Sequence, residues 1–227
     1  MNLKKEDWLG SWINFECMIN STEPALVLAW KEAEDMVMRH PPLSKMFGGS
    51  AKAFWEKTCV TITEENPVTV SGCTVTQASD GVYGEWMLAD GTSAGRNRYR
   101  IDSVLPKGLE GRTNYIFYAP DASENWPFRY IIAMEPLPNR SARENGGLMS
   151  HIHFQFASNL GQLVEDGKLI YPMWYPTLCD GAGSFLDGCN IVRAMHKLPT
   201  WDTLPALVGK PENKIPADGS KEYRVGF

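Results

Sequence analysis

Residues 68–88 read VTVSGCTVTQASDGVYGEWML and contain two short runs rich in β-branched and aromatic residues, Val68–Gln77 and Val82–Leu88. Runs of this length and composition, separated by turn residues, are typical of β-strands. Between them lies Asp80-Gly81, a pair that favours a tight hairpin turn because glycine adopts backbone angles that other residues avoid. We therefore predict an antiparallel hairpin in this stretch.

The pattern of short runs broken by turn residues continues on both sides of this hairpin. Five further runs have the same character: Thr58–Thr63, Arg98–Asp102, Asn114–Tyr118, Phe128–Met134 and His151–Ala157. Asp90-Gly91 marks a second hairpin position. Seven strands at this spacing predict an antiparallel meander over about residues 58–157 that closes into a barrel or a sandwich. The pattern does not fit a sheet of alternating strands and helices.

Helical patterns flank the predicted strands. Apolar residues recur at helical spacing over residues 24–39, within a helical segment of about 20–40. Ser21–Pro24 supplies a capping residue and a proline for the first turn, and His40–Pro42 ends the pattern. Toward the C-terminus, residues 159–166 and 185–197 are predicted to form short helices. We expect a mainly β protein with an N-terminal helix and short C-terminal helices.

The length of 227 residues and the composition indicate one domain with a core of its own. Apolar residues make up 43% and charged residues 22%, which are ordinary globular values and exclude a disordered chain. A chain of this length buries about 70% of its extended surface and needs no disulfides for stability. We expect a single domain over residues 1–200, followed by an extended or poorly ordered tail at 201–227.

Charge and hydropathy exclude several classes of partner. The formal net charge is -5, and no basic cluster stands out beyond Arg96–Arg100, so we expect no nucleic-acid partner. No run approaches the roughly 18 apolar residues of a membrane span, so we expect no membrane partner. The first residues lack the apolar segment of a secretory signal, and the five cysteines include no CxxC motif, which fits buried thiols in a reducing compartment. We therefore expect a cytoplasmic location.

One motif match points to a hydrolase. Gly91-Thr-Ser93-Ala-Gly95 matches GxSxG, the nucleophile elbow of serine hydrolases, which needs a strand before the serine and a helix after it. Here a turn pair precedes the serine and strand-like residues follow it. We therefore interpret this match as a hairpin turn.

The informative constellation is SHIHFQF at residues 150–156. On a strand, side chains two residues apart share a face, so His151 and His153 point the same way while Ile152, Phe154 and Phe156 line the other side. Two neutral imidazoles on a rigid strand are typical ligands of zinc or another divalent transition metal. The alternative is a hydrogen-bonded pair of histidines without a metal.

A zinc site usually takes at least three protein ligands, so a third must come from elsewhere. The candidates are Tyr130, Glu135, Cys179 and His196. Tyr130 and Glu135 fall on opposite faces of the predicted strand, so only one of them faces the histidines unless the strand bulges. Glu135 stands at the end of that strand, where a carboxylate reaches the rim of a barrel. We take Glu135 as the third metal ligand.

Aromatic residues make up 11% of the chain, which favours a pocket but also suits a filled small barrel. Trp174 and Tyr175 follow the histidine strand closely and either wall a cavity mouth or close the barrel. Arg96, Arg98 and Arg100 share one strand face. On an outer face they meet solvent, and facing inward they would bind an acidic ligand.

Several motifs, in order along about residues 7–197, resemble the ZinT (YodA) metal-binding family. DWLGSW at 7–12 resembles the family's opening DWxGxW, SHIHF at 150–154 matches its SHxHh strand, and YPMWYP at 171–176 resembles its WPTYYP segment. YRI at 99–101 and IFYAPD at 116–121 resemble its middle strands. The resemblance implies a calycin, lipocalin-like β-barrel.

The resemblance also implies a site. Members of the family are mostly exported, bind zinc or cadmium through three histidines at the barrel mouth, and serve zinc scavenging. Two of those histidines carry over to His151 and His153. At the place of the third stands Met134-Glu135-Pro136, so Glu135 matches the acidic neighbour and proline replaces the imidazole. The sequence also lacks the family's export signal and its His-rich stretch.

Two outcomes are therefore open. If Glu135 turns toward the histidines, a site of two histidines and one carboxylate binds Zn²⁺ or another divalent transition metal. If it points away, the barrel cavity serves an organic substrate or small-molecule ligand in a cytoplasmic enzyme or binding protein, with His151 or His153 as general acid or base. Metal binding is the function we expect, and the second outcome is the alternative.

Overall fold

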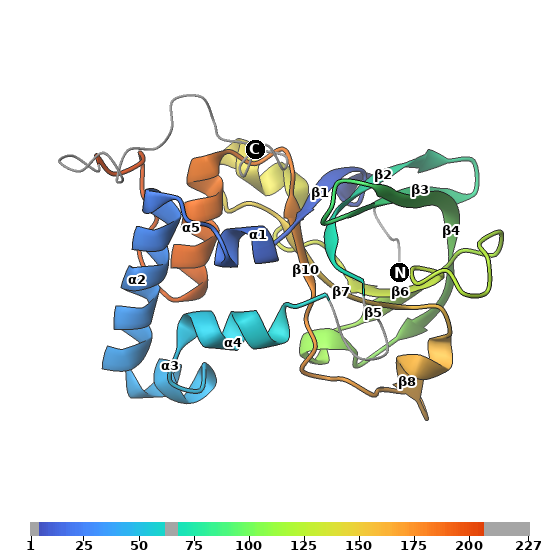
Figure 1. Ribbon diagram of the computed structural model, residues 1–227, viewed down its shortest axis with the longest axis horizontal. Helices are drawn as coiled ribbons and strands as arrows, with labels where there is room; N and C mark the ends of the chain where they lie inside the picture. Colours follow the sequence, from blue (N-terminus) through green and yellow to red (C-terminus); the bar gives the residue numbers. More distant parts are fainter. Residues whose placement is uncertain (1–4, 62–67, 207–227) are drawn as a thin grey trace.

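The computed structural model describes residues 5–61 and 68–206 (Figure 1). Eight antiparallel strands form a closed barrel in the order β1-β10-β7-β6-β5-β4-β3-β2, with β1 paired to β2. The barrel strands are β1 (Gly10–Asn14), β2 (Val70–Ala78), β3 (Gly81–Leu88), β4 (Ser93–Leu105), β5 (Asn114–Tyr118), β6 (Tyr130–Met134), β7 (His151–Ala157) and β10 (Thr177–Asp180). The predicted mainly β, antiparallel barrel is confirmed, and its form is consistent with the calycin (lipocalin-like) type.

The helices lie together on one side of the barrel (Figure 1). They are α1 (Glu16–Ile19), α2 (Pro24–Arg39), α3 (Pro41–Met46), α4 (Ala51–Thr58) and α5 (Phe185–Met195). Short 3-10 segments, η1 to η4, lie at Lys5–Asp7, Leu109–Gly111, Arg140–Asn145 and Leu160–Gln162, and β8 (Val164–Glu165) pairs with β9 (Lys168–Leu169). We call the five α-helices the helical layer.

The two longest helices begin where their sequences predict. Pro24 occupies the first turn of α2, where its missing N–H costs no hydrogen bond. Ser184 caps α5 by accepting a hydrogen bond from the backbone of Asp187, whose carboxylate accepts one in return. The predicted helices at 24–39 and 185–197 are therefore confirmed, the second ending at Met195.

Side-chain alternation along β1 and β10 divides the protein into two cores. Trp12 and Leu178 point into the barrel, whereas Ile13 and Cys179 point outward and pack in the core of the helical layer. One wall of the barrel therefore has apolar partners on both faces, which stabilises the contact between barrel and helices. The outer face of β7, between β6 and β10, belongs to this wall.

The helical region extends further than predicted. Pro41 occupies the first turn of α3 and starts a new helix, where we expected the prolines to end the helical segment. The strand predicted at Thr58–Thr63 is wrong at its start because Thr58 is the last residue of α4. Residues 62 and 63 lie outside the described residues.

The barrel also recruits two short strands that we did not predict, β1 and β10. It therefore reaches beyond the predicted range of 58–157 at both ends. Residues 159–166 form a 3-10 turn and the first strand of the β8-β9 hairpin in place of the expected helix. Of the predicted tail, residues 201–206 carry no helix or strand, and 207–227 lie outside the described residues.

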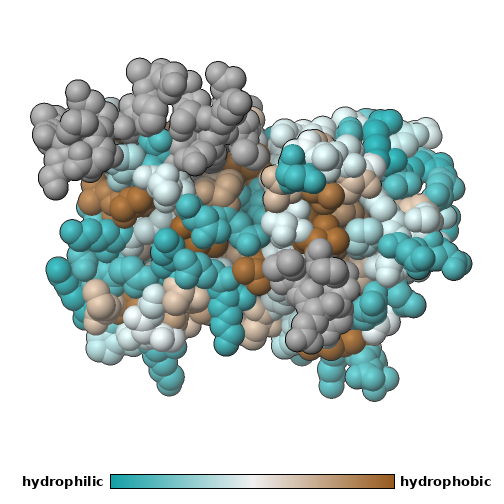
Figure 2. Space-filling model, viewed as in Figure 1, coloured by the Kyte–Doolittle hydropathy of each residue, from teal (hydrophilic) through white to brown (hydrophobic). Residues whose placement is uncertain are grey.

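Hydrophilic side chains cover most of the face shown in Figure 2, with separate apolar patches between them. No helix among the described residues combines the length and the apolarity that crossing a membrane requires. Gly91 and Ser93 of the GxSxG match lie at the β3-β4 turn and the start of β4, which confirms a hairpin turn there.

Candidate functional site

Strand β7 carries the predicted histidine pair on its outer face. Ile152 and Phe154 line the barrel interior, so His151 and His153 point out of the barrel toward the helical layer. The predicted sharing of one face by the two imidazoles is confirmed, and their ring centroids lie 5.2 Å apart. The site is therefore on the outer wall of the barrel, away from its interior.

Between this wall and the helical layer lies a cavity of about 400 Å³, which we call the outer cavity. Its lining combines three ionisable side chains with seven apolar or aromatic ones. The lining residues are Met46, Phe47, Phe54, Trp55, Glu110, His151, His153, Met173, Tyr175 and Met195. Tyr175 is the predicted pocket residue that lines this cavity together with the two histidines.

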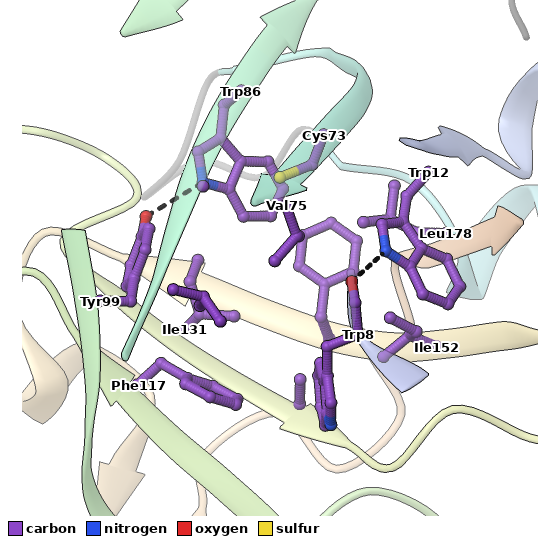
Figure 3. A pocket seen from close by; sticks show the side chains of 14 residues that line it. Trp8, Trp12, Cys73, Val75, Trp86, Tyr99, Phe117, Ile131, Ile152 and Leu178 are labelled. Atoms are coloured by element: carbon purple, nitrogen blue, oxygen red, sulfur yellow. Dashed lines mark hydrogen bonds between the residues drawn. The ribbon is translucent and has the colours of Figure 1, made fainter. Parts of the chain in front are cut away.

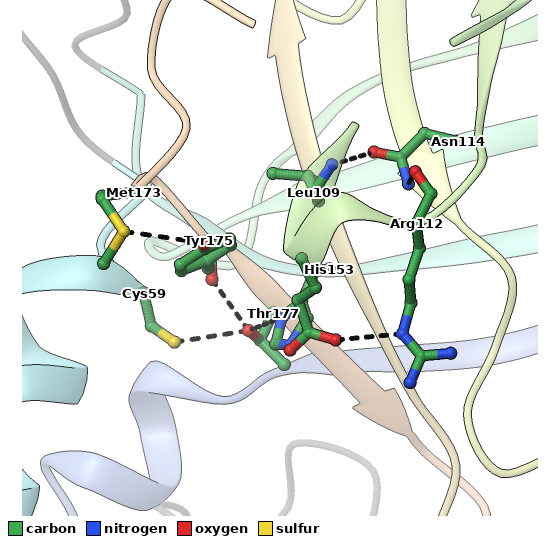
Figure 4. Close-up of polar contacts among 9 residues, drawn as sticks. Cys59, Leu109, Arg112, Asn114, His153, Met173, Tyr175 and Thr177 are labelled. Carbon is green, nitrogen blue, oxygen red and sulfur yellow. Dashed lines mark hydrogen bonds and ion pairs between the residues drawn. The ribbon is translucent and has the colours of Figure 1, made fainter. Parts of the chain in front are cut away.

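A fixed hydrogen-bond network orients the His153 ring (Figure 4). Thr177 Oγ1 donates to the Tyr175 carbonyl at 2.8 Å, so its only hydrogen is engaged there. His153 Nδ1, 2.7 Å from the same oxygen, must therefore carry its own hydrogen and donate it. Cys59 Sγ lies 3.3 Å from Thr177 Oγ1, and its S–H donates to the second lone pair of this oxygen. Nε2 is left as the nitrogen of His153 that faces the cavity.

His153 Nε2 faces a carboxylate that the sequence did not reveal. It lies 3.2 Å from Oε1 of Glu110, in η2 between β4 and β5. Glu110 Oε2 accepts from Arg112 Nε at 3.3 Å. The hydrogen bond with His153 lowers the pKa of Glu110 to about 2, so this side chain is ionised near pH 7.

The backbone of Glu110 is strained in a way that aims its side chain at the cavity. Its φ is 54°, in the left-handed region that residues with a Cβ seldom adopt. Asn114 Oδ1 accepts from the Leu109 N–H at 2.6 Å and holds the turn. A Cβ at Gly108 would lie 2.2 Å from that same oxygen, so glycine is required there. Non-glycine residues in such a conformation cluster at functional sites.

His151 stands beside this pair with an unmet hydrogen-bonding need. Its Nδ1 is buried and has no hydrogen-bond partner in the described part of the chain. The pKa of His151 is lowered to about 3, mainly by burial and to a smaller extent by the neighbouring His153. The His151 ring is therefore neutral near pH 7, the form in which imidazole binds metals.

The structure places the predicted third ligand, Glu135, elsewhere. Ala133 pairs with Phe154, and Leu137 pairs with His151. Three residues between Ala133 and Leu137 therefore lie opposite two residues of β7. This extra residue is a bulge, and it turns the exposed Glu135 to accept from the Tyr115 hydroxyl at 2.8 Å. Glu135 is not among the residues that line the outer cavity.

The remaining candidates have structural partners. Tyr130 stacks on Tyr118 with ring centroids 4.8 Å apart. Trp174 is buried against the barrel core, and its indole N–H donates to the Val60 carbonyl at 2.6 Å. Arg98 bridges Asp80 and Asp121 on the barrel surface. None of these three predicted pocket residues lines the outer cavity.

Two further candidates are buried in the helical layer. His196 accepts from the Trp55 indole N–H at 3.1 Å through Nε2 and donates to the Val192 carbonyl through Nδ1, so no free nitrogen remains. Burial lowers its pKa. Cys179 is a buried free thiol, as are Cys59, Cys73 and Cys189, whereas Cys17 is half-buried, so the interpretation as buried thiols is confirmed for four of the five cysteines.

Aromatic and aliphatic side chains point into the interior of the barrel and line a small pocket there (Figure 3). The Trp86 indole N–H donates to the Tyr99 hydroxyl at 3.0 Å, and that of Trp12 donates to the Trp8 carbonyl at 2.8 Å. About 70 Å³ remains as a cavity, lined mainly by apolar side chains. The interior therefore offers little room for a ligand, and none of the described residues that line its cavity is charged.

As the described residues are arranged, no three His, Cys, Asp or Glu side chains form a group that could hold a metal ion. Two side chains of the types that bind transition metals, His153 and Glu110, are in contact, and His151 lies next to His153. No family model, curated protein or solved structure matches the chain.

Proposed function

We propose that this protein binds a divalent transition metal ion on the outer wall of its barrel, with His153 and Glu110 as the first ligands and His151 as the third. One observation carries the proposal. His153 Nε2 and Glu110 Oε1 are electron-pair donors 3.2 Å apart, while the other nitrogen of His153 already uses a hydrogen on Thr177. Only a proton or a cation between the two atoms makes this approach favourable.

The distance suits two ligands of one ion. Zinc binds imidazole nitrogen and carboxylate oxygen at about 2.0–2.2 Å, which places neighbouring ligand atoms about 3.3 Å apart in a tetrahedral site. Thr177 supplies the outer contact that metal-binding histidines usually make, because it fixes which nitrogen of His153 carries the hydrogen. The separation of these two donor atoms therefore supports a shared ion.

The third donor fits by chemistry and requires a movement. His151 is neutral, its Nδ1 has no hydrogen-bond partner among the described residues, and its ring adjoins that of His153. Turning this ring toward Glu110 would complete a set of two imidazoles and one carboxylate, which suits Zn²⁺ and other divalent transition metals. The ZinT resemblance supports the same pair of histidines, with Glu110 in the role that we first gave to Glu135.

The deciding experiment compares two carboxylates. The chelator-treated full chain is titrated with Zn²⁺ in a calorimeter, and the metal content of the protein is measured after dialysis. We expect one ion per chain in the wild type and none in His153→Ala. Glu110→Gln should weaken binding about 100-fold, whereas Glu135→Gln should bind as the wild type does.

Binding should also release protons. An ion that replaces the proton between His153 and Glu110 competes with it, so the apparent affinity falls as the pH is lowered. Titrations in two buffers of different ionisation enthalpy measure this release. Equal affinity in wild type and Glu110→Gln, or no Zn²⁺ bound at all, would contradict the proposal.

A further inference from the structure

The outer cavity offers much more apolar wall than a metal ion needs. Seven of its ten lining side chains are apolar or aromatic. Two of them, Met46 and Met173, are 63% and 57% exposed, although methionine side chains of this size usually pack inside. Flexible, exposed methionines are typical of surfaces that receive organic ligands of varied shape. These features need an explanation that the metal proposal does not give.

We propose that the outer cavity binds a flat, apolar organic molecule that carries a hydroxyl or amino group, with that group donating a hydrogen bond to Glu110. The inference concerns the same site as the proposed function, but it rests on the cavity and does not require a bound metal. The barrel interior cannot replace this site, because its cavity of about 70 Å³ is much smaller.

The aromatic wall is held in place before any ligand arrives. Phe54 packs edge-on against both Phe47 and Trp55, with ring centroids 5.2 and 5.1 Å apart. The Trp55 indole is fixed by its hydrogen bond to His196. A wall that is ordered in the free protein loses little conformational entropy on binding, so its apolar surface contributes efficiently to affinity.

The polar end of the cavity determines which group the ligand presents. A carboxylate has about four lone-pair positions, and Glu110 uses one on His153 and one on Arg112. Its side chain is 41% exposed, so the remaining positions are accessible. Arg112 already offsets its charge, as does His153 when protonated. The ligand therefore needs a donor hydrogen and no positive charge.

The test uses 1-naphthol and 1-methoxynaphthalene as probes on the chelator-treated full chain. The two probes share the flat apolar body, and only the first has a donor hydrogen. We expect 1-naphthol to bind saturably at one site per chain, about tenfold more tightly than its methyl ether, in calorimetric titrations. Because no metal is present, this result does not depend on whether Zn²⁺ binds.

Variants locate the probe in the outer cavity. Met46→Asp combined with Met173→Asp places charges on the apolar wall and should weaken 1-naphthol binding at least about tenfold. Met38→Asp is the matched control, because Met38 is also 63% exposed but does not line the cavity, and it should bind as the wild type does. Met173→Asp alone provides the same test if the double variant does not fold.

Three results would overturn the proposal: no saturable binding of 1-naphthol, equal affinity for the two probes, or equal effects of the Met173 and Met38 substitutions. A protein that binds 1-naphthol but no Zn²⁺ would support this inference and reject the proposed function. A protein that binds Zn²⁺ but neither probe would support the proposed function and reject this inference.

Discussion

The two faces of β7 differ in almost every property, although they alternate along one strand. The inner face contributes Ile152 and Phe154 to a filled, largely apolar barrel. The outer face contributes His151 and His153 to a larger cavity with an ionised carboxylate and a ring nitrogen that has no partner in the described ranges. The barrel interior therefore stabilises the fold, and the outer wall carries the site that we propose. This division is the reverse of the interior ligand cavity that a lipocalin-like barrel leads one to expect.

The largest effect on stability is expected from a substitution on the inner face of β7. Phe154→Ala should lower the free energy of unfolding by about 3–5 kcal/mol, because it leaves a void in a packed aromatic core. Urea unfolding measures the change, and Ile101→Ala on the exposed face of β4 serves as the control, with less than about 0.5 kcal/mol. If Phe154→Ala costs as little as the control, the interior is not the stabilising core.

The next substitution acts on the outer face through a positioning residue. Thr177→Val keeps the side-chain shape but removes the acceptor of His153 Nδ1 and the donor to the Tyr175 carbonyl. We expect a loss of about 1–3 kcal/mol in unfolding free energy. Zn²⁺ affinity should fall about 10- to 100-fold, because the tautomer of His153 is no longer fixed. A Zn²⁺ affinity equal to that of the wild type would show that Thr177 has a structural role only.

Acidification separates the contributions of the two ionisable residues in the metal-free protein. Below pH 6.5 the unfolded chain protonates His151, but the folded protein does not until about pH 3, so stability falls as the pH is lowered through this range. The lowered pKa of Glu110 acts with the same sign, between 4.5 and about 2. His151→Gln should therefore flatten the pH dependence of the urea midpoint between 6.5 and 4.5, to which His196 also contributes.

Glu110→Gln is the counterpart of that variant. It should leave the slope between pH 6.5 and 4.5 in place and reduce the slope below pH 4.5. If both variants keep the wild-type slope above pH 4.5, His151 is not held neutral by its surroundings.

The smallest effect is expected where a predicted pocket residue is only a surface ion pair. Arg98→Ala removes exposed contacts to Asp80 and Asp121, and the free energy of unfolding measured in urea should stay close to that of the wild type. Binding of Zn²⁺ and of 1-naphthol should not change. A tenfold loss of either affinity would place part of the site on the β4 surface, far from the outer cavity.

Those parts of the fold that local sequence specifies could be predicted. The strands at Asn114–Tyr118 and His151–Ala157 and the helix at Pro24–Arg39 have the expected bounds, since each combines a clear periodicity with strong boundary residues. β1 and β10 could not be predicted, because they are short and are strands only through their long-range pairing with each other and with β2 and β7.

The histidines of the candidate site could be predicted from the sequence, but its carboxylate could not. The spacing of His151 and His153 follows from strand geometry, but the carboxylate that meets them lies far away in sequence, on a turn whose position depends on the closed barrel. Glu110 stands between Gly108 and Gly111, and an acidic residue flanked by glycines is the one local signal that could have pointed to it. The choice of Glu135 rests on its place at the end of the strand near the barrel rim, and the position of the bulge before Leu137, which turns it away, has no signature in the sequence.

The closure of the barrel by β1 has a consequence for how this chain is made. β1 is synthesised before the other strands of the barrel, and its partner β10 is synthesised after all of them. At about 5–20 residues per second, the apolar side chains of Trp12 and Ile13 therefore lack their β10 neighbours for about 8–33 s. A nascent chain stalled before Thr177 would expose this apolar surface and be a ready client for chaperones, and α5 must also be made before the core of the helical layer is complete.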